Sequence, residues 1–190
     1  GNGADTYYVD NPGDVVVDTG TDKAADLVFI NSYISSTFKY TLGAGIENAT
    51  LTDDAKDADL AGNLSDNTLT GNIFDNALEG GSGRDSLSGG TGNDSLIGGA
   101  DNDSLTGGMG RDSLFGGSGA DDFIFSTIND TALTSTTDDV IADFSQAQGD
   151  QIDLSAIDAN PAKSGDQAFS FMGSAFSGNA TGQLYFNTKN

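Results

Sequence analysis

In GGSGRDSLS GGTGNDSLI GGADNDSLT GGMGRDSLF GGSGADDFI, residues 80–124, one unit of nine residues occurs five times without a change of register. Each unit begins with Gly-Gly, has Asp at its sixth position and has Leu or Phe at its eighth. A fixed short period predicts a solenoid, in which every repeat stacks on the next. A flexible linker rich in Gly and Asp would have no reason to place a large apolar residue in every unit.

The glycines and the aspartate of each unit suit a hard cation. Gly at positions 1, 2 and 4 permits a tight turn that a Cβ atom would forbid, and it lets backbone carbonyls point at a common centre. Asp at position 6 adds a short carboxylate. Ca²⁺ takes about six to eight oxygen ligands, which two stacked turns can supply and one cannot. The repeats therefore predict a column of Ca²⁺ sites.

Each unit reads as a turn followed by a short strand. Side chains alternate between the two faces of a strand, so the residue at position 8 points inward and the serines at position 7 point to solvent. A unit is then half a coil, and two units of nine residues make a full coil of 18 residues. Turns on the same side stack at about 4.8 Å, the spacing of strands in a sheet.

The coil length predicts which residues become neighbours. Three pairs of aspartates should each share an ion: Asp85 with Asp103, Asp103 with Asp121, and Asp94 with Asp112. The apolar residues should form two facing columns, with Leu87, Leu105 and Phe123 on one sheet and Leu96 and Leu114 on the other. The predicted metal ligands are Asp85, Asp94, Asp103, Asp112, Asp121, Gly81, Gly83, Gly90, Gly92, Gly99, Asp101, Gly108, Gly110, Gly117, Gly119, Asn76 and Asn67.

The period continues upstream in a weaker form over residues 62–79. These two units have Asn67 and Asn76 at position 6, and an amide oxygen can bind Ca²⁺ without contributing charge. Pairs of these asparagines with Asp85 and Asp94 are either weaker sites or metal-free turns. The prediction is at least three Ca²⁺ ions, and five or more if the asparagine turns also bind. Asp101 replaces Gly at position 4 of one regular unit, and Asp tolerates the left-handed region better than most residues.

Composition indicates a protein whose folding depends on metal. The net charge is −22, and the 29 acidic residues include only two glutamates, Glu47 and Glu79. So many carboxylates repel one another in a compact state, and we expect Ca²⁺ to supply much of the folding free energy of the repeats. The acidity argues against nucleic-acid binding, and the absence of Cys excludes disulfides. No apolar run approaches the ~20 residues of a membrane span, and no secretory signal is visible at the N-terminus.

The sequence divides into three regions. Residues 1–61 read as irregular lead-in coils, with a truncated repeat at 1–9 that places Asp5 at position 6. Residues 62–124 form the repeat region, degenerate over 62–79 and regular over 80–124. Residues 125–190 are predicted to cap the open solenoid end with β-strands, because an exposed sheet edge must be covered. The chain begins inside what reads as a repeat, so we expect a longer parent protein.

Strands are expected in both flanking regions. In the lead-in they are DVVVD (14–18), DLVFINSYI (26–34), FKYTL (38–42) and ENATLT (47–52). After the repeats, FIFS (123–126) is expected to leave the roll, DDVIADF (138–144) and DQIDLSAI (150–157) to be strands, and FSFMGSAF (169–176) with GQLYFNT (182–188) to form a final hairpin. Four acids of this last region, Asp139, Asp143, Asp150 and Asp153, are candidates for one further ion, although a structural role in turns is the commoner one.

The repeats resemble the haemolysin-type β-roll of bacterial RTX (repeats-in-toxin) proteins. GADDFIF, DVIADF and GDQIDLSAI are similar to the segment after the repeats in serralysin-type proteases, secreted lipases and alginate epimerases. GADTYYVD and YTLGAGIENATLT are also common in such proteins. The resemblance implies an all-β, right-handed parallel β-roll or β-helix with a C-terminal β-strand cap. It also implies a parent protein that the type I secretion apparatus exports unfolded and that folds on external Ca²⁺, outside the cell or at its surface.

Catalysis is not expected of this chain. It has no His, which excludes H-E-x-x-H zinc proteolysis and Ser-His-Asp hydrolysis, and it has no G-x-S-x-G elbow. The first functional hypothesis is a Ca²⁺-driven folding and secretion module attached to an enzyme or toxin. The alternative is a polysaccharide-binding or adhesin module that uses the β-roll surface. Arg84 and Arg111 should lie on opposite sides of the roll, so they form no single basic patch.

Overall fold

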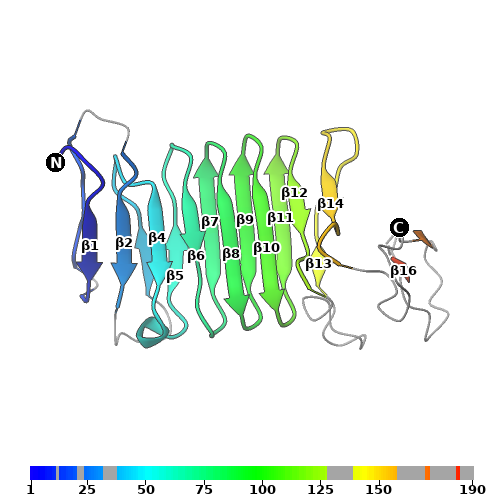
Figure 1. Ribbon diagram of the computed structural model, residues 1–190, viewed down its shortest axis with the longest axis horizontal. Coiled ribbons are helices and arrows are strands. Elements are labelled where there is room, and N and C mark those ends of the chain that lie inside the picture. The colour runs from blue at the N-terminus through cyan, green and yellow to red at the C-terminus, as the bar shows by residue number, and fades with distance from the viewer. Residues whose placement is uncertain are drawn as a thin grey trace. The chain divides into compact units, whose positions relative to one another are not determined.

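Every regular repeat unit folds as a turn followed by a strand, as the pattern predicts. The computed structural model describes residues 1–11, 13–20, 24–31, 38–127 and 139–157, and the backbone of residues 170–171 and 183–184. The chain divides into two compact units, Gly1–Leu154 and Ser155–Asn190. The first unit contains the repeats and is an all-β parallel solenoid (Figure 1).

Two parallel sheets form the walls of this solenoid. The larger sheet contains, in spatial order, β1 (Thr6–Val9), β2 (Leu27–Ile30), β4 (Asn48–Leu51), β6 (Thr68–Thr70), β8 (Ser86–Thr91), β10 (Ser104–Met109), β12 (Asp122–Ile124) and β14 (Gln151–Asp153). The smaller sheet contains β13 (Val140–Ile141), β11 (Ser113–Ser118), β9 (Ser95–Ala100), β7 (Ala77–Ser82), β5 (Asp59–Ala61) and β3 (Lys39–Thr41). A single 3₁₀ turn, η1 (Asp53–Ala55), follows β4 within the described residues.

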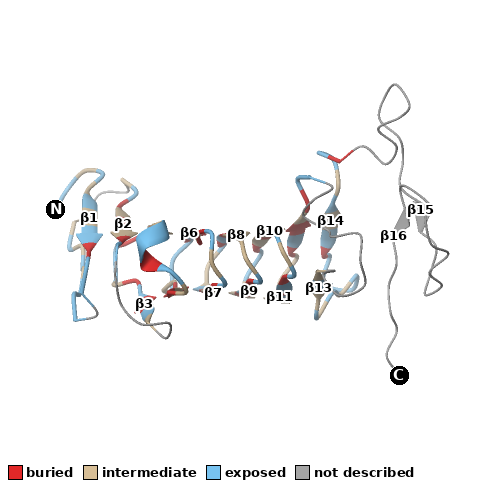
Figure 2. Cartoon of the chain, turned by 90° about the horizontal axis from the view of Figure 1, so that it is seen from below, coloured by how far each residue is buried: buried red, intermediate tan, exposed pale blue. Residues whose placement is uncertain are grey.

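The register of the strands confirms the coil of 18 residues. Leu87 pairs with Leu105 in the larger sheet, and Leu96 pairs with Leu114 in the smaller one. Phe123 continues the first of these rows. Figure 2 shows the sheets as two layers, with β6, β8 and β10 in one layer and β7, β9 and β11 in the other. The two predicted apolar columns therefore face each other across the interior.

In the repeats, each strand from β6 to β12 contributes one large inward side chain to the core. Leu96, Leu105 and Phe123 are 0% exposed, whereas the serines that precede the leucines are exposed or half-buried. The core continues into the lead-in coils through Val28 and Ile30, which also have no exposed surface. Burial of a leucine-sized side chain stabilises a fold by about 1.5–3 kcal/mol, so the stacked interior gives the coils their main sequence-encoded stability.

The glycines allow the turns of successive coils to stack closely. An ideal Cβ atom at Gly108 would lie 2.0 Å from the carbonyl oxygen of Gly90, and Gly108 has a φ of 103°. Only glycine fits both constraints. Asp101 takes the left-handed conformation with a φ of 77°, which agrees with the expectation that Asp can replace Gly at this position.

The lead-in differs from its prediction at residues 14–18, which form no strand. Val15 and Val17 are 80% and 53% exposed, so this valine-rich stretch buries little apolar surface. The N–H of Val16 donates to the Tyr40 hydroxyl over 3.3 Å instead of to a neighbouring strand. The other predicted strands of the lead-in appear as β2, β3 and β4, and residues 32–34 of the prediction lie outside the described residues.

Two expectations for the end of the repeats were wrong. FIFS does not leave the roll, because β12 pairs in parallel with β10 and then with β14. The two short strands near the C-terminus, β15 (Ser170–Phe171) and β16 (Gln183–Leu184), pair in parallel, so they are not a hairpin. Most of the predicted cap lies outside the described residues and stays a prediction. Among the residues that are described, no helix is long and apolar enough to span a membrane.

Candidate calcium sites

Polar side chains form two columns along the edges of the solenoid, at the residue immediately before a strand. Among the strands of the two large sheets, β3 and β5 are exceptions, because they follow Phe38 and Ala58. The first column precedes strands of the larger sheet and consists of Asp5, Asp26, Glu47, Asn67, Asp85, Asp103, Asp121 and Asp150. The second column precedes strands of the smaller sheet and consists of Asn76, Asp94, Asp112 and Asp139. The five repeat aspartates are thus divided between the two columns as predicted.

Neighbouring aspartates in a column are joined by one repeated hydrogen bond. The backbone N–H of Asp85 donates to Oδ1 of Asp103 over 2.9 Å, and the N–H of Asp103 donates to Oδ1 of Asp121 over 2.9 Å. In the second column, the N–H of Asp94 donates to Oδ1 of Asp112 over 2.8 Å. The three predicted pairs are therefore adjacent in space, and their shared ions stay a prediction.

The second oxygen of these carboxylates has a different environment. Oδ2 of Asp85, Asp94, Asp103 and Asp121 is buried and accepts no hydrogen bond from the protein. The four residues are at most 2% exposed. A buried charged oxygen without a partner costs several kcal/mol unless a cation or a donor compensates it. Rows of such oxygens, repeated from coil to coil, fit a row of bound cations.

The pKa values of three column aspartates are raised, as expected for buried carboxylates that lack a cation. Burial raises the pKa of Asp94 and of Asp103 to about 7, although the hydrogen bond from a backbone N–H opposes the rise. Burial likewise raises the pKa of Asp85 to about 6. The negative charges of neighbouring aspartates raise all three pKa values further. Without a cation, these turns hold protons more strongly than an ordinary carboxylate does.

Backbone carbonyls complete an oxygen-rich environment between stacked turns. An ideal Cβ atom at Gly98 would lie 2.4 Å from Oδ2 of Asp103 and 2.7 Å from the carbonyl oxygen of Gly116 in the next coil. The carboxylate and the carbonyl therefore lie over the same glycine. The predicted ligand set did not include the glycines at position 1 of each unit. Their carbonyl oxygens are candidate calcium ligands in addition to those of the glycines at positions 2 and 4.

The asparagine turns close by hydrogen bonds alone. Oδ1 of Asn76 accepts from the N–H of Asn72 over 2.9 Å, and its Nδ2 donates to the carbonyls of Ala58 and Lys56 over 2.8 and 3.3 Å. Asn67 repeats this pattern in the first column. The amide group already binds the oxygens that an ion would need, so these contacts favour the metal-free alternative for the asparagine turns.

The columns extend to acids that the repeat pattern did not identify as members. Oδ1 of Asp139 accepts from the N–H of Asp112 over 2.8 Å, and Oδ1 of Asp150 accepts from the N–H of Asp121 over 3.2 Å. Asp143 instead accepts from Gly116 and Gly117. Asp139 and Asp150 thus continue separate columns instead of forming one site. An acid directly before a β-strand is the sequence signal that would have found them.

Comparison with known protein families identifies the repeats. Residues 61–96 and 88–123 match the family model of the RTX calcium-binding nonapeptide repeat. The chain carries RTX calcium-binding repeats. The match covers the coils that contain Asp85, Asp94, Asp103, Asp112 and Asp121, so calcium is the ion that these repeats bind. None of the curated proteins matches the chain significantly.

Proposed function

We propose that this chain is a calcium-dependent folding module of a larger secreted protein. The observation that carries the proposal is the row of buried, uncompensated Oδ2 atoms in the RTX repeats. These atoms make the stacked turns unfavourable without cations and favourable with them, because metal binding then contributes directly to the free energy of folding.

The charge of the chain strengthens this dependence on calcium. At a net charge of −22 the compact state is opposed by mutual repulsion of carboxylates. Extracellular calcium modules bind at roughly 10⁻⁴–10⁻³ M Ca²⁺, far above the concentration in the cytosol. The proposed cycle is therefore export of an unfolded chain through a type I secretion apparatus, followed by folding outside the cell or at its surface.

We propose no catalytic activity for the chain itself, because the paired aspartates are used as candidate ligands and the sequence contains no His. No feature of the described part of the fold supports the alternative of polysaccharide binding. Arg84 lies next to Asp85 of the first column and Arg111 next to Asp112 of the second, so the two arginines belong to opposite edges of the solenoid. A single basic patch for an acidic polymer is therefore not formed by this pair.

Circular dichroism and calorimetry of the whole chain test the folding switch. Addition of millimolar Ca²⁺ to chelated protein should produce a large gain of β-structure and a cooperative thermal transition. Mg²⁺ at the same concentration is the control, since its strict octahedral geometry suits these turns poorly. The proposal is wrong if the chain is equally folded in chelator and in Ca²⁺.

A further inference from the structure

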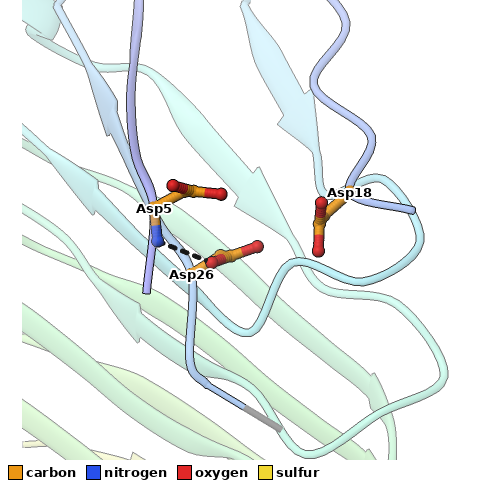
Figure 3. A group of neighbouring side chains, drawn as sticks. All are labelled: Asp5, Asp18 and Asp26. Atoms are coloured by element: carbon orange, nitrogen blue, oxygen red, sulfur yellow. Dashed lines mark hydrogen bonds between the residues drawn. The ribbon is translucent and has the colours of Figure 1, made fainter. Parts of the chain in front are cut away.

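A separate group of carboxylates lies at the N-terminal end of the larger sheet, outside the matched repeats. Asp5, Asp18 and Asp26 each offer one carboxylate oxygen, and these oxygens lie within 4.8 Å of one another (Figure 3). Asp5 and Asp26 directly precede β1 and β2, whereas Asp18 comes from the segment between these strands. Stacking of the first two coils therefore brings the three acids together.

Asp26 shows that the group is more than a solvated acidic surface. Its side chain is 1% exposed. Oδ1 accepts from the N–H of Asp5 over 2.8 Å, which is the bond that joins neighbouring aspartates in the RTX coils. Oδ2 is buried and accepts no hydrogen bond. Figure 3 shows the Asp26 carboxylate directed toward Asp18, so this uncompensated oxygen faces the group.

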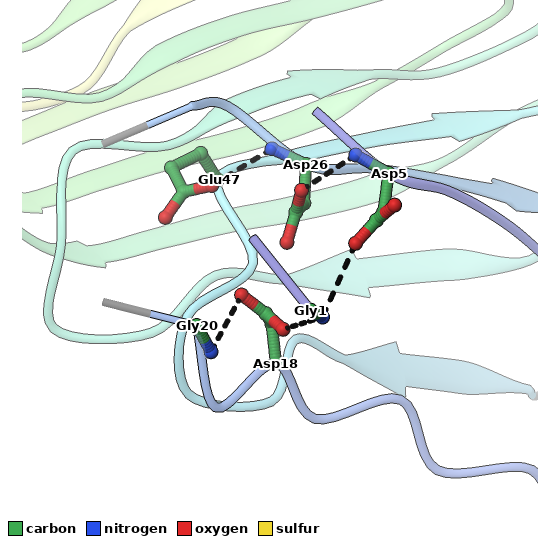
Figure 4. A network of polar contacts seen from close by, with 6 residues as sticks. All are labelled: Gly1, Asp5, Asp18, Gly20, Asp26 and Glu47. Atoms are coloured by element: carbon green, nitrogen blue, oxygen red, sulfur yellow. Dashed lines mark hydrogen bonds and ion pairs between the residues drawn. The ribbon is translucent and has the colours of Figure 1, made fainter. Parts of the chain in front are cut away.

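The contacts around this group include two backbone hydrogen bonds. The N–H of Gly20 donates to Oδ2 of Asp18 over 3.1 Å, and the N–H of Asp26 donates to Oε2 of Glu47 over 2.9 Å (Figure 4). Neither bond reaches Oδ2 of Asp26, which accepts no hydrogen bond.

We propose that Asp5, Asp18 and Asp26 bind a Ca²⁺ ion in addition to those of the RTX repeats. Three carboxylates are hard oxygen ligands whose combined charge favours a divalent cation over a monovalent one. A backbone carbonyl is also close: an ideal Cβ atom at Gly20 would lie 2.0 Å from the carbonyl oxygen of Gly1 and 2.6 Å from Oδ2 of Asp18. This calcium would connect the first coil to the second.

Tyr7 provides a probe that is specific for this site. Tyr7 lies in β1, two residues after Asp5, and burial raises its pKa, with a further rise from the negative charges of Asp5, Asp26 and Asp18. Residues 62–124 contain no Tyr, and the chain contains no Trp. Tb³⁺ substitutes for Ca²⁺ at oxygen sites and emits when a nearby aromatic ring is excited. Tyrosine-sensitised Tb³⁺ emission should therefore report this site and not the RTX columns.

The test is a Tb³⁺ titration of the whole chain, with the number of bound ions measured separately by equilibrium dialysis. The wild type should give tyrosine-sensitised emission that excess Ca²⁺ reverses. Asp18→Asn and Asp26→Asn should reduce the emission to that of Tb³⁺ without protein. Tyr7→Phe should lower the emission without changing the number of bound ions.

Two control variants separate this site from the repeats. Asp10→Asn removes an exposed acid of the same coil and should leave the emission unchanged. Asp103→Asn should lower the number of bound ions but keep the emission, so a failure of the RTX sites is recognised independently. Emission at the wild-type level in Asp18→Asn, or in Tyr7→Phe, would overturn the proposal. If Asp26→Asn does not fold, the emission of Asp18→Asn and of Tyr7→Phe still tests the site.

Discussion

One side-chain atom distinguishes an aspartate turn from an asparagine turn in this solenoid. In Asp94 the second oxygen is buried without a donor. In Asn76 the corresponding nitrogen donates to two carbonyls of the preceding coil. The same turn is therefore completed by amide protons in one coil and requires a cation in the next.

Replacement of Asp103 tests the sharing of ions between coils. Asp103 is adjacent to both Asp85 and Asp121, so Asp103→Asn should lose ions from two pairs at once. The Ca²⁺ concentration at the folding midpoint should rise by about tenfold or more, the equivalent of about 1.4 kcal/mol. Isothermal titration of Ca²⁺ measures both effects. Asp122→Asn, which removes an exposed acid next to the column, is the matched control and should behave like the wild type.

The raised pKa values predict that the metal-free fold becomes less stable as the pH rises. The pKa of Asp94 and of Asp103 in the folded chain is about 7, against an ordinary value of 3.8. The stability that these groups contribute to the metal-free fold is therefore complete below about pH 4 and is lost as the pH rises through about 6–7. Ca²⁺ competes with the same protons, so its affinity should rise over that window.

Circular dichroism in chelator checks this pH dependence. The chain should show more β-structure at about pH 5 than at about pH 8, and Ca²⁺ should restore the structure at the higher pH. Equal spectra at both values in chelator, or a loss of structure on acidification, would contradict the assignment of uncompensated buried carboxylates.

At the level of the strands, sequence periodicity predicted how the coils stack. It failed where a segment lacks the repeat, as at residues 14–18 and at Asp26. Leu or Phe at position 8 determines which face of a strand is buried, and this signal gave the correct pairing of Leu87 with Leu105. Residues 14–18 have a strand-like composition but pair with no strand, and composition alone does not reveal the lack of a pairing partner. Asp26 was not predicted as a column member because no glycine pattern precedes it, although it stands directly before β2.

The asparagine coils should contribute stability that does not depend on bound metal. Asn76→Ala removes three hydrogen bonds from a buried turn, so the free energy of unfolding in Ca²⁺ should fall by about 1–3 kcal/mol. The number of bound ions should remain that of the wild type. Thermal unfolding together with equilibrium dialysis measures both quantities. If Asn76→Ala loses an ion, the asparagine turns are weak calcium sites and not metal-free turns.

Across the whole first unit, two kinds of interaction hold the coils together. The apolar interior runs from Val9 to Phe125 and is encoded by side chains that are present under all conditions. At the edges, the second carboxylate oxygens of Asp85, Asp94, Asp103 and Asp121 lack donors. We therefore propose that calcium completes folding at these edges, and we expect the RTX coils to be the part of the solenoid most sensitive to its removal.

Hydrogen–deuterium exchange of the whole chain, resolved by peptide, measures whether the RTX coils need calcium to fold. In millimolar Ca²⁺ the amides of β8, β9, β10 and β11 should be strongly protected, because they belong to paired strands in the interior of the sheets. In chelator at neutral pH the same amides should exchange at rates near those of an unfolded chain, and protection should return when Ca²⁺ is added. Equal protection of these four strands in chelator and in Ca²⁺ would show that the RTX coils fold without calcium.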